Sequence, residues 1–261
     1  MRKYGLFAWM AFLNLIEYRV NFLWSLGGTV IQTLMLYMFW TAVLGSGFGN
    51  GLYDRSSIGL YYLFIMFVSS FTEFGHYRIA NLINNGDLGM ELVKPYNFFI
   101  KEIFQTIPDK FIKILIIVIV YLFLISVGVK HSLDIVHVVI ALISTIFAAM
   151  CKFYISLTLG GLGFWFKRVH GFNSLFWNLG GLFSGDLLPL NIMPAVLFTA
   201  SAYLPFRYMA YFPVQIMLGK LTIGSELIVG LGLQIFWVIF FAVICKFVWR
   251  MGLLEFDASG K

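Results

Sequence analysis

The stretch LIVGLGLQIFWVIFFAVICKFVW, Leu227 to Trp249, decides what kind of fold this chain adopts. It has a single charged residue, Lys246, and exceeds the roughly 20 apolar residues that a helix needs to cross a hydrocarbon layer about 30 Å thick. The whole chain shares this character, since 61% of its 261 residues are hydrophobic and only 11% are charged. A water-soluble domain of that composition would expose large apolar patches. The sequence therefore predicts an all-α, polytopic membrane protein.

Further apolar runs, bounded by charged or turn residues, bring the number of predicted transmembrane helices to six. The six runs cover Val20–Leu44, Ile58–Phe74, Phe111–Val129, Leu133–Tyr154, Phe172–Leu188 and Leu227–Trp249. We expect them to form a single transmembrane domain over residues 1–261. Three segments of this domain are expected to have other roles, namely residues 1–19, 75–110 and 183–222.

The N-terminal segment is expected to be a helix lying in the membrane interface. Glu17 and Arg19 would lie at membrane depth if residues 1–19 belonged to the first span. Trp9 and Tyr18 are typical interface anchors. The sequence therefore predicts a separate interfacial helix over residues 1–19.

Glycine runs predict close contacts between helices, because a helix without side chains on one face lets a neighbour approach. They occur at Gly27 and Gly28, at Gly160 to Gly163 and at Gly180 to Gly185. The second run follows Tyr154, where the fourth apolar segment continues to Phe166 and becomes longer than one crossing requires. We therefore expect a tilted or kinked helix there.

Positive charges predict the orientation, since cytoplasmic loops of membrane proteins are enriched in lysine and arginine. With a cytoplasmic N-terminus, the outer side holds only Arg55, Lys130, Arg207 and Lys220. The cytoplasmic side then collects Arg2, Lys3, Arg19, Arg78, Lys94, Lys101, Lys110, Lys113, Lys167, Arg168, Lys246, Arg250 and Lys261. Both termini are therefore expected to face the cytoplasm.

The segment 75–110 is the longest predicted cytoplasmic joint. Asn84, Asn85 and Gly86 indicate a turn, after which Asp87 can cap a short helix that ends at Lys94 and Pro95. Apolar side chains of this helix are expected to form a docking surface beside the charges of Asp87, Glu91 and Lys94; they are Leu88, Met90, Leu92 and Val93. A solvated linker is the alternative interpretation of the same residues.

The segment 183–222 is expected at the outer end of the fifth span. It begins with FSGDLLPLNIMP, Phe183 to Pro194, and contains Pro205, Arg207 and Pro213 further on. These residues exclude one straight transmembrane helix. Irregular backbone at membrane depth needs cover from protein. We therefore expect a re-entrant or surface-lying pair of short helices, with Gly185 and Pro189 ending the span and Pro194 starting the next helix.

Four separated stretches carry a resemblance to a known family. They are EYR from Glu17, NNGDLGMELVKP from Asn84, FSGDLLPLNIMP from Phe183 and LPFRYMAYFPVQIMLG from Leu204. Together they resemble the six-span permease subunits of type-2 ATP-binding-cassette transporters, and the likeness extends over nearly the whole chain. Lys152, inside the fourth span, departs from the family pattern.

The resemblance implies an exporter of the bacterial plasma (inner) membrane, with a pore built by two like subunits and driven by separate cytoplasmic ATPase subunits. ATP and Mg²⁺ would be bound by those partners, and no cofactor, metal, catalytic residue or nucleic acid is expected for this chain. By the same resemblance, the residues that couple to the ATPase are Asn84, Asn85, Gly86, Asp87, Leu88, Glu91, Lys94 and Pro95. The outer re-entrant gate would comprise Ser184, Gly185, Asp186, Pro189, Pro194, Pro205, Phe206 and Pro213.

A self-sufficient secondary transporter or channel is the alternative function. The nearest string to a phosphate-binding loop, VQIMLGKL from Val214, lacks its first glycine and the hydroxyl residue after Lys220, so ATP would have to be hydrolysed by another chain. Intramembrane charges can instead mark an ion path, and the candidates are Glu73, Lys152, Asp186 and His137. The sequence leaves the cargo open among drugs, peptides, lipids and glycans.

Overall fold

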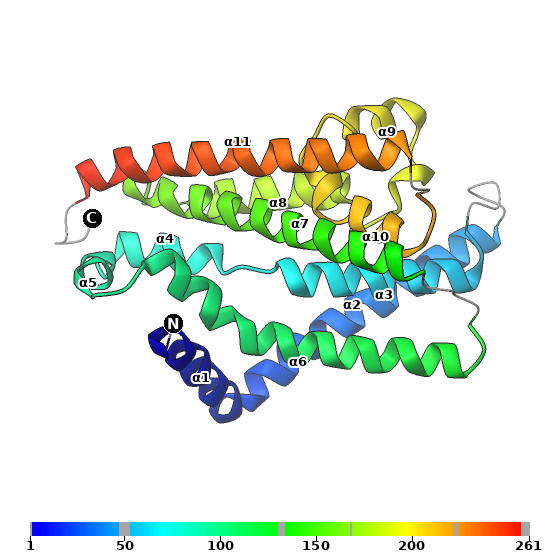
Figure 1. The fold of residues 1–261 in the computed structure, drawn as a ribbon, viewed down its shortest axis with the longest axis horizontal. Coiled ribbons are helices and arrows are strands. Elements are labelled where there is room, and N and C mark those ends of the chain that lie inside the picture. The colour runs from blue at the N-terminus through cyan, green and yellow to red at the C-terminus, as the bar shows by residue number, and fades with distance from the viewer. Residues whose placement is uncertain (1, 47–52, 130–133, 168, 222–223, 257–261) are drawn as a thin grey trace.

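A computed structural model describes residues 2–46, 53–129, 134–167, 169–221 and 224–256, and within these ranges the chain forms helices and no strand (Figure 1). The first half contains α1 (Arg2–Glu17), α2 (Arg19–Gly45), α3 (Arg55–Thr72), α4 (His76–Asn84), α5 (Leu88–Val93) and α6 (Phe98–Ser126). The second half contains α7 (Ile135–Gly161), η1 (Leu162–Phe164), α8 (His170–Ser184), η2 (Leu190–Ile192), α9 (Ala195–Ser201), η3 (Phe206–Met209), α10 (Tyr211–Met217) and α11 (Ser225–Glu255). The predicted all-α class is confirmed.

Three helices among the described residues are long and apolar enough to cross a membrane, namely Arg19–Gly45, Ile135–Phe164 and Ser225–Glu255. They contain the first and sixth predicted spans and all but the first two residues of the fourth; Ile135–Phe164 is α7 continued by η1. The other three predicted spans also coincide with helices, but α3 has 18 residues and α8 has 15. At about 1.5 Å per residue α8 is only about 22 Å long. Leu133, where the fourth span was expected to begin, lies outside the described residues, as do Lys130, Arg168, Lys261 and Thr222.

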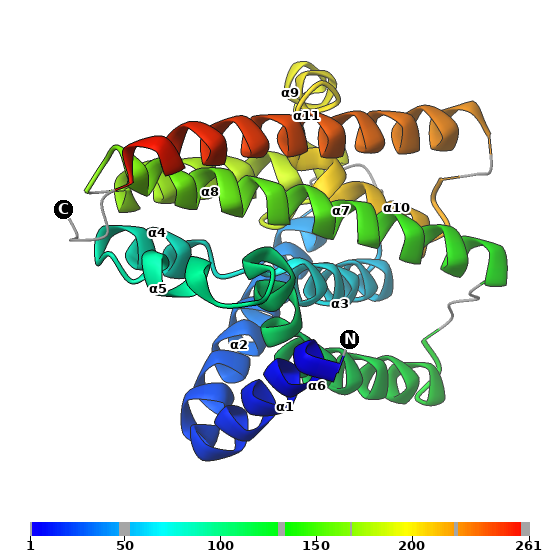
Figure 2. The same cartoon turned by 60° about the vertical axis from the view of Figure 1, so that its left-hand side comes forward.

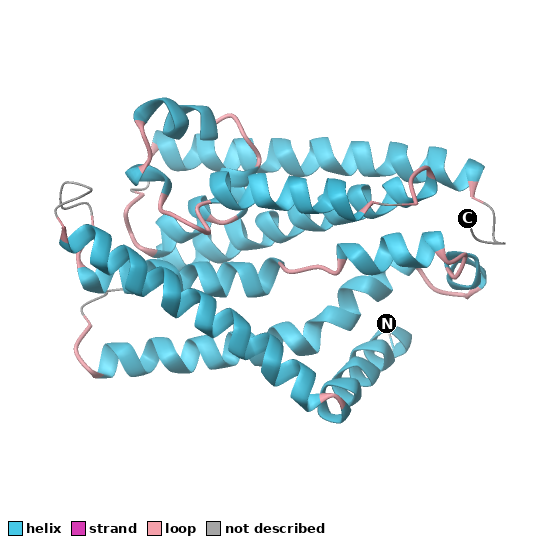
Figure 3. Ribbon diagram, turned by 180° about the vertical axis from the view of Figure 1, so that it is seen from behind, coloured by secondary structure: helices cyan, strands magenta, loops and turns pink. Residues whose placement is uncertain are grey.

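α7 and α11 run along the long axis of the molecule and pack side by side, whereas α2 crosses them obliquely (Figures 1 and 2). α1, α4, α5 and the C-terminal end of α11 lie in one half. The short helices that follow α8 lie in the other half, where loops separate them (Figure 3). α9 projects from the bundle there (Figure 2). The two segments with special predicted roles, 75–110 and 183–222, thus lie at opposite ends.

The N-terminal segment and the helix after Pro95 are arranged partly as expected. α1 ends at Glu17 and meets α2 at an angle, so residues 2–17 do form a separate helix (Figure 1). Its contacts are mainly with α6. α6 is one helix from Phe98 to Ser126 and passes through Pro108, so it joins the segment 75–110 directly to the third predicted span. Proline cannot donate its helical hydrogen bond, and α6 changes direction along its length.

Two of the three glycine runs mark close helix contacts. A Cβ atom on Gly161 would lie 2.9 Å from Val248 of α11, and one on Gly180 would lie 3.0 Å from Phe206. After Gly161 the helix tightens into η1, which agrees with the expected distortion. Gly27 and Gly28 make no such contact within the described chain, because no atom beyond the local helix backbone lies within 4 Å of a Cβ at either position. A contact of these glycines with a second subunit, which the same pattern predicts, stays a prediction. α2 has no buried residue at all.

A buried amide joins α7, α11 and η3 near the end that holds the short helices. The Gln234 side chain donates to the carbonyl oxygens of Ser144 at 2.8 Å and Tyr208 at 2.9 Å, and it accepts from the Ser144 hydroxyl at 3.0 Å. Buried polar groups stabilise a fold only when they are paired in this way. This network fixes η3 against α7 and α11.

The packing of α10 against α11 predicts opposite effects for two neighbouring glycines. A Cβ on Gly230 would lie 2.2 Å from the buried ring of Phe212, whereas nothing lies within 4 Å of a Cβ on Gly232. Gly230→Ala should lower the free energy of unfolding by about 1–3 kcal/mol through overpacking. Gly232→Ala should leave it unchanged or raise it by up to about 1 kcal/mol, since alanine favours helix. Thermal unfolding of the purified protein measures both, and equal stabilities of the two variants would contradict this packing.

Candidate functional site

The turn between α4 and α5 forms as the sequence predicts. α4 ends at Asn84, Asn85 follows as its C-cap, and Gly86 has a φ of 80°, a left-handed conformation that favours glycine. The Asn84 side chain donates to the carbonyl oxygen of Lys167 at 3.2 Å, which ties this turn to the connection between η1 and α8. α5 then begins at Leu88, after Asp87. Asp87 occupies the N-cap position, but its side chain accepts no hydrogen bond there.

α5 divides its apolar residues between the core and the surface. Leu88 is 0% exposed and packs with Ile79, Ile83, Phe98 and Trp249, so its predicted place on a docking surface is wrong. The other three are exposed, Met90 by 65%, Leu92 by 42% and Val93 by 87%. We call Met90, Leu92 and Val93 the α5 surface. Its exposed apolar side chains are adjacent to a charged cluster.

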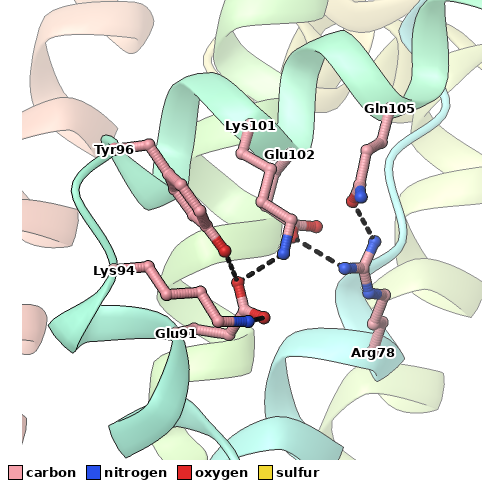
Figure 4. Close-up of polar contacts among 7 residues, drawn as sticks. All are labelled: Arg78, Glu91, Lys94, Tyr96, Lys101, Glu102 and Gln105. Atoms are coloured by element: carbon pink, nitrogen blue, oxygen red, sulfur yellow. Dashed lines mark hydrogen bonds and ion pairs between the residues drawn. The ribbon is translucent and has the colours of Figure 1, made fainter. Parts of the chain in front are cut away.

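Glu91 is the centre of this charged cluster (Figure 4). Lys101 of α6 donates to Glu91 Oε2, and Tyr96 donates to the same oxygen at 2.7 Å. Lys94 pairs with Oε1 at 2.9 Å. Desolvation alone would raise the pKa of Glu91, but the hydrogen bonds from Lys101, Lys94 and Tyr96 outweigh it and lower that pKa to about 2. Because Lys101 is buried, its ammonium depends on Glu91 as a counterion.

A second ion pair joins α4 to α6 one residue further along. Arg78 Nη2 lies 3.2 Å from Glu102 Oε1, and Arg78 Nη1 donates to Gln105 Oε1 at 2.7 Å (Figure 4). Desolvation raises the pKa of the buried Glu102 carboxyl, and the charge of Arg78 opposes that effect. Lys101 and Glu102 are adjacent on α6. Their ion pairs therefore join α6 to α5 and to α4.

α1 packs on the same segment from the side. Lys3 donates to the carbonyl oxygen of Pro95 at 2.7 Å, and the backbone N–H of Asn97 donates to the Tyr4 hydroxyl at 3.0 Å. The Phe7 ring lies edge-on to Tyr96 with centroids 4.9 Å apart. Lys101 Nζ lies 5.7 Å from the Phe7 centroid. α1 therefore packs against Tyr96 and Lys101, the two residues that bond to Glu91 Oε2.

Sequence reasoning missed four residues that hold this end together. Arg78 and Lys101 were used only as positive charges that set the orientation, and Glu102 and Tyr96 were given no role. Glu91 and Lys94 are three residues apart on one helix and could have been paired from the sequence. The pairing of Glu91 with Lys101 could not be predicted from the sequence, because Pro95 interrupts the helix and leaves the relative direction of α5 and α6 open.

The segment 183–222 also begins as predicted. α8 ends at Ser184, and Gly185, with a φ of 87°, terminates it in the left-handed conformation. Pro189 precedes η2, Pro194 precedes α9, and Pro205 precedes η3. Phe206 begins η3 and packs on Phe176 with centroids 5.1 Å apart, while Pro213 lies within α10. The expected pair of short helices, α9 and α10, is present.

Side chains of other helices cover the irregular backbone after α8. The Tyr61 hydroxyl donates to the carbonyl oxygen of Gly185 at 2.6 Å. Tyr62 and the Trp40 indole both donate to the carbonyl oxygen of Leu187, at 3.0 and 2.9 Å. Carbonyl groups that a broken helix leaves free in an apolar environment need partners of this kind. Side chains of α2 and α3 therefore supply the hydrogen bonds that these carbonyl groups need.

The charged residues of the alternative function are partly brought together. Glu73, Lys152 and Asp186 line one cavity of about 340 Å³. His137 is separate, and its Nδ1 lies 3.2 Å from Asp134 Oδ2 at the start of α7. Within the described residues, no three histidine, cysteine, aspartate or glutamate side chains group closely enough to hold a metal ion.

Comparison with known proteins supports the resemblance seen in the sequence. A family model described as "ABC-2 family transporter protein" matches residues 29–260, which is most of the chain. A comparison with curated proteins found no match.

The Glu91 cluster predicts that one neutral substitution loosens the joint between α5 and α6. Glu91→Gln keeps the size of the side chain but leaves the buried Lys101 ammonium without its counterion. We expect the joint to lose roughly 1–3 kcal/mol of local stability. Hydrogen exchange of residues 88–101 measures the loss. Glu255→Gln, an exposed control at the end of α11, should leave this exchange unchanged, and equal protection in both variants would contradict the pairing.

The depressed pKa of Glu91 predicts how this stability depends on pH. Its pKa is about 2 in the folded chain against an ordinary value of 4.5. The folded state therefore gains from the ionised carboxylate, and this gain is complete above pH 4.5 and disappears as the pH falls towards 2. Protection of residues 88–101 should fall with pH in that window in the wild type and not in Glu91→Gln. An identical pH profile for both proteins would show that Glu91 is not responsible.

Proposed function

Because the chain belongs to the ABC-2 family of transporter membrane proteins, we propose that it is the permease subunit of an exporter whose ATPase subunits dock at α5. It is the membrane component of a transporter and not an enzyme. ATP and Mg²⁺ bind to the separate ATPase chains. Closure of those chains around nucleotide pushes on α5 and shifts the permease between inward-open and outward-open states.

The observation that carries this proposal is the α5 surface with its rigid support. Met90, Leu92 and Val93 are exposed, while Leu88 on the same short helix is fully buried. An apolar patch beside charged side chains is typical of a protein-docking surface. The ion pairs of α5 and α4 with α6 supply the path by which force on this surface reaches a long helix.

We further propose six membrane crossings with both termini in the cytoplasm. α2, α6, α7 and α11 have 27 to 31 residues each, so each is about 40 Å long or more. α3 and α8 complete the set of six crossings. α8 is too short to cross alone, and the irregular backbone that follows it, whose carbonyl groups accept hydrogen bonds from aromatic side chains, completes its crossing. In this arrangement α5 faces the cytoplasm and α9 and α10 form the outer re-entrant gate. The positive-inside pattern favours this orientation in a bacterial plasma membrane.

A second permease subunit, identical or similar, completes the pathway. α2 has no buried residue within the described chain, and a Cβ on Gly27 or Gly28 would meet nothing. A helix with small residues on an uncovered face is suited to close contact with another helix. We place the second subunit on this face of α2.

A self-sufficient transporter remains the second candidate because Glu73, Lys152 and Asp186 share a cavity. An ion path would need titratable groups in sequence along the bundle. Glu73 is instead paired with Lys113 at 3.0 Å, and His137 lies apart from the cavity lining. The paired arrangement favours the ATPase-driven function.

The docking proposal predicts that a charge on the α5 surface separates the two chains. Val93→Asp and Met90→Asp should each weaken binding to the cognate ATPase at least about tenfold, which corresponds to about 1.4 kcal/mol. Binding to the purified permease and nucleotide-dependent transport by the reconstituted complex measure this loss. Val196→Asp, on an exposed position of α9 at the opposite end, is the matched control and should bind normally. The proposal fails if Val93→Asp and Val196→Asp behave alike.

A further inference from the structure

A cavity with a partly polar lining lies between α2, α3, α7 and α8. Its volume is about 340 Å³. One wall carries hydroxyl and amide groups, among them Thr29 and Gln32 of α2 and Ser69 of α3. Leu36 and Met66 contribute apolar surface to the same cavity. Such a mixture is typical of a ligand site in which a few polar groups set the orientation of the ligand.

The cavity is elongated along α3, and its charges lie towards opposite ends. It extends from Tyr62 to Thr72, which is about 15 Å at 1.5 Å per residue. Asp186 is at the Tyr62 end, because the Tyr62 hydroxyl donates to the neighbouring Leu187 carbonyl. Lys152 is nearer the other end, because the ring of its neighbour Phe153 packs on Phe74 with centroids 5.0 Å apart.

The charges that line this cavity differ in whether the protein neutralises them. Glu73 is paired with Lys113 at 3.0 Å. Asp186 Oδ1 is buried and has no hydrogen-bond partner among the described residues. Lys152 forms no ion pair with a carboxylate in the part of the chain that the structure describes. One anionic and one cationic group are thus left for a ligand.

We infer that this cavity binds a zwitterionic amphiphile, with its cationic group at Asp186 and its anionic group at Lys152. Trp177 and Tyr62 line the cavity too and offer aromatic rings to a quaternary or primary ammonium. A purely anionic ligand would leave Asp186 without a partner of opposite charge, and a purely cationic ligand would leave Lys152 without one. The inference rests on the proposed function in one respect, since it makes the occupant of this cavity the transported cargo.

Three short-chain probes with the same alkyl tail test the inference on the complete permease in uncharged maltoside micelles. They are hexylphosphocholine, hexyltrimethylammonium and hexyl phosphate, and isothermal titration gives their Kd values. Hexylphosphocholine should bind most tightly. Asp186→Asn should weaken hexylphosphocholine and hexyltrimethylammonium by at least about tenfold and spare hexyl phosphate. Lys152→Gln should weaken hexylphosphocholine and hexyl phosphate to the same extent and spare hexyltrimethylammonium.

Matched controls separate a charge effect from general damage. Asp134→Asn and Lys246→Gln remove the same charges outside the cavity lining and should leave all three Kd values unchanged. Lys152→Arg keeps the positive charge, so this variant should bind hexylphosphocholine within about threefold of the wild type. The inference is overturned if both cavity variants bind hexylphosphocholine like the wild type, or if each weakens all three probes equally.

The test also distinguishes this inference from the proposed function, because the titration needs no ATPase. Probe selectivity that follows Asp186 and Lys152 supports the site even if no ATPase drives the permease, in which case only the proposed function fails. Conversely, ATPase-driven transport by a permease whose probe binding ignores both residues would remove the cavity inference alone.

Discussion

The ion pair between Lys101 and Glu91 is the contact on which the α5 end of this protein depends. Both side chains are largely buried, and losing one partner of such a pair leaves the other charge without its counterion. α5 therefore cannot move away from α6 without exposing or stranding a charge. α6 continues without interruption to Ser126. A displacement of α5 is thereby transmitted into the bundle, which is what a permease driven from outside its own chain requires.

The opposite end obeys a related constraint with uncharged groups. The chain leaves helical geometry after Ser184, and the carbonyl oxygens of Gly185 and Leu187 take hydrogen bonds from aromatic side chains of α2 and α3. In an apolar environment those bonds replace the water that would satisfy a surface loop. The two ends of the bundle are thus both held by polar contacts between elements that are far apart in the sequence, and the cavity with Lys152 and Asp186 lies between them.

Local features of the fold could be predicted from the sequence, whereas contacts across the fold could not. The turn at Gly86, the end of α8 at Gly185 and the start of α9 after Pro194 follow from the conformational limits of glycine and proline. The family match over residues 29–260 confirmed what the separated motifs indicated. The burial of Leu88, the open face at Gly27 and the partner of Lys101 depend on how helices cross. One chain's hydrophobic pattern does not specify such crossings when nearly every face of every helix is apolar.

The central claim is that α5 is where a separate ATPase transmits its energy to this chain. A photo-crosslinking amino acid at position 93, introduced into the full-length protein in cells, tests it directly, with the same group at position 196 for comparison. We predict an adduct at position 93 with a nucleotide-binding protein and none at position 196. An adduct with such a protein at position 196 alone would contradict the claim.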